Sequence, residues 1–350
     1  MPFELSSLAA LAALPFDEVI DVRSPSEFAE DHLPGALSLP VLSDAERARV
    51  GTIYVQQDRF LARKIGAALV ARNAAAHLEG PLADRDGGWR PLVYCWRGGQ
   101  RSGSFASILQ QVGWRADTVR GGYRSYRRLV VRALYDTPLP LRLVVVDGGT
   151  GTAKTALLQH LRAQGAQTID LEDLAAHRGS VFGARPGGQP GQKLFESRLA
   201  LAMAPLDPAR PVFVEAESAK VGERLLPPSL WEAMKSAPRL RLEAPIEARA
   251  RHLVTAYADL LEDLPALLDV LDRLVPYHGR ERVRAWQAMA REGRFAPLAA
   301  ELVQEHYDPR YTRSAARHAA PLAVLHIPVL DESRLADAAA RALAAVMQTG

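Results

Sequence analysis

The sequence contains one cysteine, Cys95, in 350 residues, so the chain cannot form an internal disulfide. We therefore expect a reducing compartment, the cytoplasm. Lysine is scarce as well, so arginine supplies most of the positive charge, and the formal net charge is only +3. Long apolar runs are also lacking. The stretch from Leu5 to Phe16 is too short to span a bilayer and has no positive leading segment, so we expect no membrane contact and predict an amphipathic helix there.

The length and composition indicate two folded domains. At 350 residues the chain exceeds one typical domain, and each half can bury a core of its own. Hydrophobic residues make up 48% and charged residues 24%, which is usual for a soluble globular protein. Pro138 and Pro140 mark a boundary between the halves. We predict one domain over residues 1–137 and a second over residues 138–350.

The single cysteine lies between an apolar strand and a Gly-rich loop. The run from Pro91 to Tyr94 ends at Cys95, and a helix is expected to begin near Ser102. The N–H groups of such a loop and the positive end of the helix dipole stabilise an anion, so the thiol pKa should fall and its nucleophilicity should rise. We predict that Cys95 is catalytic. The predicted anion loop around it comprises Trp96, Arg97, Gly98, Gly99, Gln100, Arg101 and Ser102.

The Cys-x5-Arg spacing from Cys95 to Arg101 leaves several chemistries open. Arg101 can hold an anionic oxygen, sulfur or selenium group above the thiol. A buried structural cysteine is the alternative, although such a residue needs neither the glycines nor the arginines that follow it. Protein tyrosine phosphatases, arsenate reductases and rhodanese-type sulfurtransferases all use a similar loop.

An upstream segment favours the rhodanese interpretation. Ile20 to Phe28 resembles the entry signature of rhodanese domains, in which a short strand carries Asp-Val-Arg and a helix begins near Ser24. The thiol loop follows this segment in the chain, as in rhodaneses and not in phosphatases. Val119 to Tyr123 is similar to the last strand and turn of the same fold.

The second half opens with the strand, loop and helix of a Walker A motif. The apolar run from Leu141 to Asp147 predicts a buried parallel strand, and Ala156 to Leu161 predicts a helix. Loop N–H groups can wrap a phosphate, Lys154 neutralises it, and the Thr155 hydroxyl can reach Mg²⁺. Ala153 replaces the second glycine of the motif, a departure that bears on ATP hydrolysis more than on phosphate binding. The predicted phosphate-binding residues are Gly148, Gly149, Thr150, Gly151, Thr152, Ala153, Lys154 and Thr155.

Two further strands are expected to bring carboxylates to the same place. Gln167 to Glu172 resembles a second strand, and Pro211 to Ser218 predicts a buried strand that ends in acids. Ligands of open α/β sheets bind beyond the carboxyl ends of the strands, so we expect these acids near Lys154. They can orient a substrate or hold Mg²⁺ through water. Each of them can equally cap a helix or pair with an arginine, and we assign no metal ligand. A Gly-rich turn without a ligand is the alternative for the Walker loop.

Arginines recur every four residues after the rhodanese-like turn, with Tyr123 and Tyr126 beside them. In a helix several of these arginines share one face. The segment is a candidate RNA-backbone surface with aromatic rings for stacking, and a solvated helix face is the alternative. The predicted RNA-binding residues are Arg120, Arg124, Arg127, Arg128 and Arg132.

The order of the two modules resembles the bacterial tRNA 2-selenouridine synthase family. Three further stretches strengthen the resemblance: Asp170 to Gly183, Val214 to Gly222, and Tyr307 to Tyr311. The resemblance implies an α/β fold with two parts. The first is an N-terminal rhodanese-like domain, a parallel sheet flanked by helices; the second is a P-loop NTPase-like α/β domain with a helical C-terminal part.

The same resemblance implies a two-step transferase reaction on the wobble 2-thiouridine of tRNA. Geranyl diphosphate alkylates the sulfur, and selenium from selenophosphate then replaces the geranylated sulfur to give 2-selenouridine. It also implies tRNA as partner, an enzyme that supplies selenophosphate, no tightly bound cofactor, and Mg²⁺ as a candidate ion. The residues implied to bind substrate or support the site are Asp21, Arg23, Asp170, Glu172, His177, Arg178, Ser180, Phe182, Gly183, Glu215, Glu217 and Ser218.

Two other functions fit part of the chain. One is a small-molecule sulfurtransferase with a regulatory P-loop half. It would act without RNA, and its reaction would not require the stretch from Asp170 to Gly183. A P-loop kinase or ATPase with a rhodanese-like binding module shows magnesium-dependent nucleotide turnover, and Ala153 argues against it.

Overall fold

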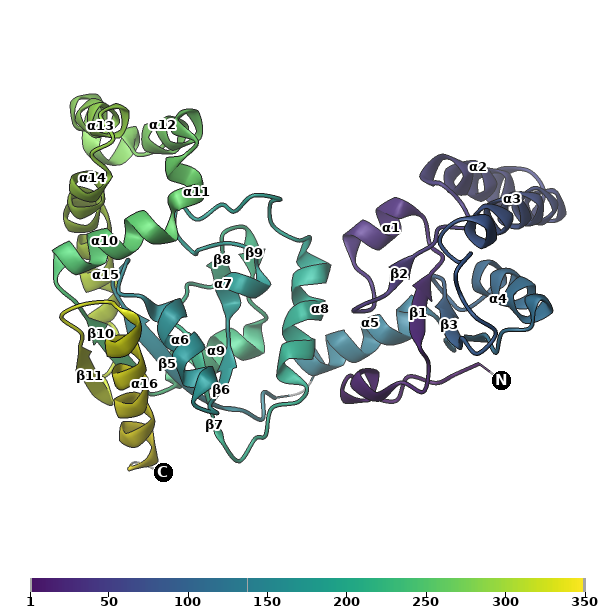
Figure 1. Cartoon of the computed structure of the whole chain (residues 1–350), viewed down its shortest axis with the longest axis horizontal. Coiled ribbons are helices and arrows are strands. Elements are labelled where there is room, and N and C mark those ends of the chain that lie inside the picture. The colour runs from purple at the N-terminus through teal and green to yellow at the C-terminus, as the bar shows by residue number, and fades with distance from the viewer. Residues whose placement is uncertain (1, 137, 349–350) are drawn as a thin grey trace. The chain divides into compact units, whose positions relative to one another are not determined.

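The computed structural model describes residues 2–136 and 138–348. The chain divides into two compact units, Met1–Thr137 with Pro190–Pro205, and Pro138–Gln189 with Leu206–Gly350. Figure 1 shows that each unit has its own sheet flanked by helices, and all strands of these two sheets run parallel. The predicted α/β fold class is therefore confirmed. Residues 1, 137 and 350, where the predicted domains begin or end, lie outside the described residues.

The first unit has a four-stranded sheet in the order β2-β1-β3-β4. Asp21 at the end of β1 lies opposite Tyr94 at the end of β3, so the chain segments after both strands meet at one edge. The strands are β1 (Glu18–Asp21), β2 (Leu37–Ser38), β3 (Pro91–Tyr94) and β4 (Asp117–Thr118). The helices of this unit are η1 (Ala9–Ala13), α1 (Pro25–Glu30), α2 (Asp44–Gln56), α3 (Arg59–Glu79), α4 (Gln100–Val112), α5 (Tyr123–Val131), the π-helical η2 (Arg132–Asp136) and α8 (Gln192–Met203).

Two local predictions in this unit have different outcomes. The helix expected near Ser24 is α1, and Ser24 and Glu27 form a capping box at its start. The amphipathic helix predicted over Leu5 to Phe16 is wrong, since only the 3-10 helix η1 forms there. A helix of that length is marginal without strong packing. The preceding Phe3 instead pairs with the chain after β4 through its N–H and carbonyl groups, which fixes an extended entry to the unit.

Helix α8 belongs to the first unit although its sequence interrupts the second. The Ser197 hydroxyl donates to buried Asp31 at 2.9 Å, and Glu196 pairs with Arg127. The predicted second domain, 138–350, included this helix, and the structure places it with the first unit instead. The partners of α8 come from distant parts of the chain, so no local pattern revealed its position.

The second unit has a five-stranded sheet in the order β11-β10-β5-β7-β6. The chain passes from β5 to β6 and β7 on one side and later crosses to β10 on the other. A topological switch point therefore lies between β5 and β7, where ligands of open α/β sheets bind. The strands are β5 (Arg142–Gly148), β6 (Gln167–Ile169), β7 (Pro211–Glu215), β10 (Arg239–Glu243) and β11 (Ala323–His326), with a separate antiparallel pair, β8 (Lys220–Val221) and β9 (Arg224–Leu225).

The helices of the second unit form two groups. Helices α6 and α16 pack on one core with β5, β10 and β11, whereas α12, α13 and α14 surround a second core that contains Trp286 and Phe182. No helix in the described part of the chain is long and apolar enough to cross a membrane. The helices are α6 (Lys154–Ala163), α7 (Leu171–Leu174), α9 (Pro228–Ser236), α10 (Ile246–Ala256), α11 (Ala258–Leu261), α12 (Leu264–Asp272), α13 (Val275–Arg291), α14 (Phe295–Leu302), the π-helical η3 (Val303–Tyr307), α15 (Asp308–Ala315) and α16 (Glu332–Met347).

Candidate functional site

Cys95 directly follows β3 and begins the thiol loop, residues 95–102. Its sulfur accepts hydrogen bonds from the Gly99 N–H at 3.4 Å and the Ser102 hydroxyl at 3.2 Å. The thiol is buried, and burial by itself raises its pKa; the hydrogen bonds from Ser102 and Gly99 and the charge of Arg101 outweigh this and leave the pKa below its usual value. The surroundings therefore favour a thiolate, in the direction that the sequence predicted.

Two glycines bring the turn after β4 against the thiol loop. Gly98 has φ +65°, and a Cβ atom there would lie 2.5 Å from the Val119 carbonyl oxygen. Gly122 has φ +59°, and a Cβ atom there would collide with the carbonyl oxygen of Cys95. The Tyr123 N–H donates to that same oxygen at 2.9 Å. Only glycine allows this approach, which fixes the backbone of the loop.

The two arginines of the thiol loop have different surroundings. Arg101 Nη1 lies 2.7 Å from Glu27 Oε2, so its charge is engaged by α1. Burial favours the neutral form of Glu27, but the Arg101 guanidinium outweighs it and lowers the pKa of Glu27 to about 2. Arg97 is exposed and makes no ion pair with the described residues. In this arrangement Arg97 is the guanidinium open to an incoming anion, whereas we expected Arg101 in that place.

Asp21 and Arg23 form a buried ion pair behind the thiol loop. Their side chains pair at 2.6 Å with 1% or less of either exposed. The Arg23 guanidinium also donates to the Asp31 carbonyl oxygen at 2.5 Å and lies 4.1 Å from the centroid of the Tyr123 ring. Because both groups are buried and paired, they hold the sheet edge and the turn in place rather than contact a substrate.

The predicted arginine surface lines a groove of about 740 Å³ on the first unit, together with Trp96 and Lys193. The Arg127 guanidinium is already engaged within the protein, because it donates to the Lys193 carbonyl oxygen at 3.2 Å and pairs with Glu196 of α8. The exposed members are Arg120, Arg124, Arg128 and Arg132.

The Walker loop, residues 148–155, leaves β5 at the switch point and enters α6. Lys154 Nζ donates to the Gly148 carbonyl oxygen at 3.0 Å. Gly151 has φ +83°, and Ala153 has φ +63°, in the left-handed region that glycine adopts without penalty. An L-residue with a Cβ atom costs roughly 1–2 kcal/mol there. This strain is the physical reason why the motif has glycine where this chain has Ala153.

A buried arginine that sequence reasoning missed holds the Walker loop. Arg249 on α10 donates to the Thr150 carbonyl oxygen at 2.9 Å and pairs with Asp308 through contacts of 2.6 and 2.9 Å. A Cβ atom on Gly149 would lie 2.8 Å from Arg249 Nη2, so Gly149 leaves room for the guanidinium. The stretch Tyr307 to Tyr311 contained the partner, Asp308, but Arg249 lies in a helix without any motif.

Two glutamates, Glu172 and Glu217, interact with Lys154, and a third, Glu215, contacts Glu172. Glu172 accepts a hydrogen bond from the Thr155 hydroxyl at 3.0 Å, and its N–H donates to Glu215 at 2.6 Å. Burial raises the pKa of each carboxyl group. For Glu217, burial and the neighbouring Glu172 outweigh Lys154 and raise the pKa to about 8. The raised pKa favours the protonated form of Glu217 at neutral pH, and in that form the carboxyl can donate a hydrogen bond.

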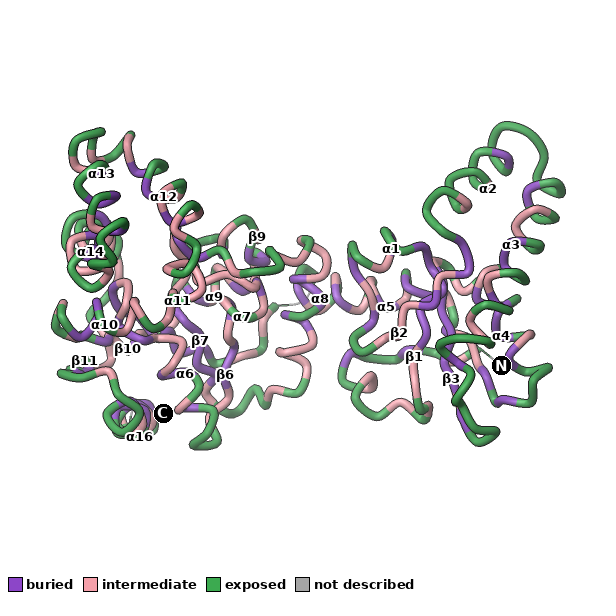
Figure 2. The backbone as a smooth tube through the Cα atoms, turned by 45° about the horizontal axis from the view of Figure 1, so that its top comes forward, coloured by how far each residue is buried: buried purple, intermediate pink, exposed green. Residues whose placement is uncertain are grey.

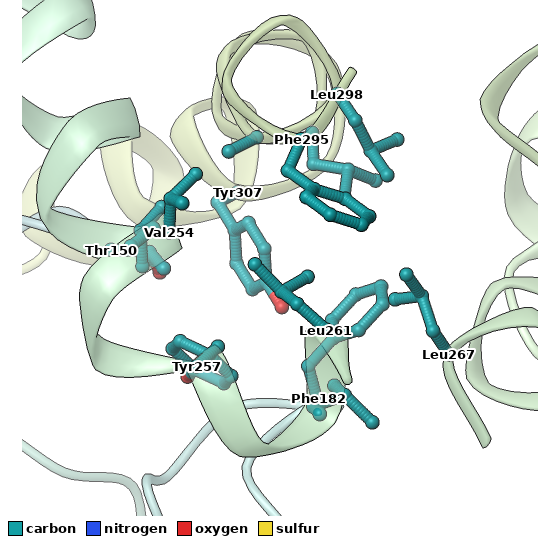
Figure 3. A pocket seen from close by; sticks show the side chains of 13 residues that line it. Thr150, Phe182, Val254, Tyr257, Leu261, Leu267, Phe295, Leu298 and Tyr307 are labelled. Carbon is teal, nitrogen blue, oxygen red and sulfur yellow. The ribbon is translucent and has the colours of Figure 1, made fainter. Parts of the chain in front are cut away.

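The Walker loop borders a pocket of about 830 Å³ that opens at the switch point. A smaller, apolar pocket of about 60 Å³ adjoins it, and Figure 3 shows the side chains that surround this smaller pocket, with Phe182 and Phe295 among them. Such a volume holds roughly four to six water-sized groups. The residues that line both pockets are Thr150, Leu253, Tyr257 and Tyr307.

Comparison with known proteins assigns both units. A family model described as the tRNA 2-selenouridine synthase AAA domain matches residues 141–268, and one described as a rhodanese-like domain matches residues 5–129. The relatives of this chain include proteins that carry the name tRNA 2-selenouridine synthase. The Alcanivorax borkumensis relative is 38% identical over 246 residues, 68% of this chain and 66% of its own length. The Aeromonas salmonicida relative is 36% identical over 73% of this chain and 69% of its own length.

The Cupriavidus pinatubonensis relative is 32% identical over 342 residues, which cover 86% of this chain and 90% of the relative. The chain belongs to the tRNA 2-selenouridine synthase family. The resemblance given by the sequence motifs is thereby confirmed, as is the order of a rhodanese-like domain before a P-loop domain.

The stretch from Asp170 to Gly183, which resembles the synthase family most specifically, folds along the edge of the Walker pocket. The hydroxyl oxygens of Ser180 and Tyr257 lie 2.9 Å apart, and Arg178 pairs with Asp259 at 2.6 Å. Phe182 lines the apolar pocket. The predicted residues that line the larger pocket are Gly148, Thr150, Gly151, Ala153, Lys154, Thr155, Glu172, Arg178, Ser180, Glu217 and Ser218.

Other predicted residues support this site without lining the larger pocket. Asp170 caps α7 by accepting from the Asp173 N–H at 2.8 Å. Thr152 donates to the Gly149 carbonyl oxygen at 2.8 Å. A Cβ atom on Gly183 would lie 2.9 Å from the ring of His177, so these two residues pack directly together. The supporting predicted residues are Gly149, Thr152, Asp170, His177, Gly183 and Glu215.

Proposed function

We propose that this protein converts the wobble 2-thiouridine of tRNA to 2-selenouridine through an S-geranyl intermediate, with geranyl diphosphate and selenophosphate as co-substrates. Membership of the tRNA 2-selenouridine synthase family supports the overall conversion. The two co-substrates are assigned to two sites, geranyl diphosphate to the Walker pocket and selenophosphate to the thiol loop.

The observation that carries the geranyl assignment is the junction of the two pockets of the second unit. The larger pocket has Lys154 and the Walker loop for a diphosphate, and the apolar pocket opens from it at Thr150 and Tyr257. An amphiphile with an anionic head and a hydrocarbon tail matches this pair. The apolar pocket has room for roughly one five-carbon isoprene unit, which would be the second, distal unit of the geranyl chain. The first unit, which is bonded to the diphosphate, would then lie at the junction of the two pockets, between Tyr257 and Tyr307.

In the first step the thiocarbonyl sulfur attacks the allylic carbon of geranyl diphosphate. The carbon–sulfur bond forms, the carbon–oxygen bond breaks, diphosphate leaves with the electron pair, and the base releases its N3 proton. Negative charge grows on the diphosphate in the transition state. Fixed N–H donors of the Walker loop and the Lys154 ammonium stabilise that charge more than they stabilise the ground state.

Magnesium fits the oxygen donors beside the diphosphate position. Thr155 supplies a hydroxyl and Glu172 a carboxylate, which are the ligand types that Mg²⁺ prefers. The ion would neutralise charge on the diphosphate. No group of three or more His, Cys, Asp or Glu side chains within the described residues is arranged to hold a metal ion alone, so phosphate oxygens would have to complete the coordination.

In the second step selenium replaces the geranylated sulfur. The C2–Se bond forms, the C2–S bond breaks and geranylthiol leaves, while water takes the phosphoryl group of selenophosphate to give phosphate. The thiol loop supports anion binding through its N–H groups and the exposed Arg97. The lowered pKa of Cys95 favours its thiolate, which would attack phosphorus, release selenium from selenophosphate for C2, and pass the phosphoryl group on to water.

The arginine groove supports tRNA as the substrate. Four exposed arginines in one groove beside Trp96 provide charge for phosphodiesters and a ring for stacking. Arg127 holds α8 in place and is assigned a positioning role rather than an RNA contact.

Mass spectrometry of tRNA nucleosides tests the proposed function. Cells with the protein should contain 2-selenouridine, and cells without it should contain only 2-thiouridine. The purified protein should form S-geranyl-2-thiouridine from tRNA and geranyl diphosphate, and 2-selenouridine once selenophosphate is added. Sulfur transfer to a small thiol without RNA, or ATP turnover without tRNA modification, would contradict the proposal and favour one of the two other functions.

A further inference from the structure

Helices α2 and α3 form a hairpin whose end exposes large apolar side chains. The two helices pack together, and Ile53 on α2 and Ala62 on α3 are buried. At the end of the hairpin, however, Val55 is 81% and Phe60 72% exposed, and Tyr54 and Leu61 are also exposed. Figure 2 shows this end of the hairpin in green, for exposed residues. Clustered exposed apolar groups of this kind mark binding surfaces.

The connection between the two helices is well ordered, so the exposure is not that of a frayed end. The N–H groups of Gln57 and Asp58 both donate to the Ile53 carbonyl oxygen, at 3.0 and 3.1 Å. The Asp58 carboxylate accepts from the Leu61 N–H at 2.6 Å and caps α3. Each helical residue adds 1.5 Å, so α2 carries the exposed end roughly 20 Å from its first turn.

The charges around this end have one dominant sign. Residues 49–64 contain four cationic side chains and a single acid, Asp58, whose carboxylate caps α3. The Arg59 guanidinium lies 5.6 Å from the centroid of the Tyr54 ring. No ion pair within the described part of the chain engages these cations. They are Arg49, Arg59, Arg63 and Lys64.

We propose that this hairpin tip, defined as the four exposed apolar residues and the four cations just named, binds unpaired nucleotides of the tRNA substrate. Bases would stack on the Phe60 and Tyr54 rings while the cations contact the phosphodiesters. Proteins usually recognise single-stranded RNA by stacking its unpaired bases on aromatic side chains, with arginine nearby. This inference rests on the proposed function, which makes tRNA the substrate.

Charge decides in favour of RNA over a protein partner. A net charge of +3 within sixteen residues complements a polyanion, whereas the cores of protein interfaces are depleted in charged residues. The tip shares no residue with the groove that contains Arg120 to Arg132. It therefore constitutes a second, independent RNA contact on the first unit.

The test is the affinity of the full-length protein for a tRNA that carries wobble 2-thiouridine, measured over a series of salt concentrations. Phe60→Ala should weaken binding by about 5- to 150-fold, because that is the range for loss of one base–aromatic stack, and Phe60→Trp should retain binding. Arg63→Ala should reduce the slope of log affinity against log salt by roughly 0.7. The matched control is Val112→Ala, an exposed apolar residue of α4 outside the tip, and it should leave the affinity unchanged.

Equal affinities for Phe60→Ala and the parent would overturn the inference. Sedimentation with anionic phospholipid vesicles that depends on Phe60, combined with unchanged tRNA affinity, would overturn it in favour of a lipid surface. Both results leave the proposed function intact as long as the parent modifies this tRNA. A parent that neither binds nor modifies the tRNA would overturn the proposed function, and the inference with it.

Discussion

The thiol loop and the Walker loop have the same backbone plan, but the pKa of the acidic group beside each loop is shifted in opposite directions. Each joins the carboxyl end of a parallel strand to a helix, and each contains glycine at positive φ, Gly98 in one and Gly151 in the other. Around Cys95, hydrogen-bond donors lower the pKa of the buried thiol. Around Lys154, burial and mutual repulsion raise the pKa of the carboxyl groups, that of Glu217 to about 8.

The difference shows that the hydrogen bonds, charges and burial at each loop, rather than the backbone plan that the two loops share, set the pKa values at these sites. In the first unit the hydrogen bonds to the thiol and the charge of Arg101 lower the pKa of Cys95. In the second unit the raised pKa favours the neutral form of Glu217 at neutral pH, although this carboxyl lies near Lys154. A neutral carboxyl does not repel an anion. A strand–loop–helix motif therefore predicts that an anion binds, but not the protonation state of the groups that surround it.

Removing the thiol should have the largest effect and separates the two loops by function. Cys95→Ser should reduce the formation of 2-selenouridine by about a thousandfold or more, since loss of a nucleophile typically costs at least that much. The geranylation rate should remain close to that of the parent, because the Walker loop is intact. Both nucleosides are measured by mass spectrometry in the purified reaction. Unchanged 2-selenouridine would show that the thiol is not catalytic.

Removing the ammonium of the Walker loop should affect the opposite step. Lys154→Ala should slow geranyl transfer by about a hundred- to a thousandfold, the usual cost of losing one transition-state donor. Selenium transfer should persist when the variant receives tRNA that already carries S-geranyl-2-thiouridine. The control is Lys220→Ala, an exposed lysine of the same unit. If both steps fail equally in Lys154→Ala, the division into two sites is wrong.

Neutralising Glu217 should change how stability depends on pH. The folded state raises the pKa of this carboxyl from 4.5 to about 8, so the folded protein binds the proton more tightly than the unfolded chain. This contribution to stability is complete below pH 4.5 and is lost as the pH rises toward 8. Glu217→Gln removes that loss, so the melting temperature of the variant relative to that of the parent should rise between pH 4.5 and pH 8, the window set by the two pKa values. Exposed Glu223→Gln serves as the control, and an equal gain there would contradict the assignment.

Restoring the motif glycine should have the smallest effect. Ala153→Gly relieves roughly 1–2 kcal/mol of left-handed strain, but it increases the entropy of the unfolded chain, by roughly 0.4–1 kcal/mol, and removes a buried methyl group. The free energy of unfolding should change by less than about 1 kcal/mol, as measured by denaturant unfolding. Gly151→Ala should be clearly more destabilising, because its Cβ atom would lie 2.9 Å from Leu253. A larger loss in Ala153→Gly than in Gly151→Ala would contradict this account.

Local patterns predicted the parts of the molecule that local chemistry determines. The strand, loop and helix around Cys95 and around Lys154 follow from apolar runs and glycines that are close in sequence, and the structure contains both. Arg249 could not be found in this way, because its role comes from contacts with Thr150 and Asp308, which lie far from it in the chain. The stretch from Leu5 to Phe16 shows the reverse case, where tertiary pairing of Phe3 prevailed over an apolar pattern.

Helix α8 has a consequence for the order of events during synthesis. The chain emerges from its N-terminus at about 5–20 residues per second, so Ser197 and Glu196 appear only after β5, α6 and β6 of the other unit have been made. Until then Asp31 lacks the hydrogen bond from Ser197, and Arg127 lacks the ion pair with Glu196. The unit that is translated first is thus completed by a segment from the second half of the chain. Its folding therefore cannot finish before much of the second unit has been synthesised.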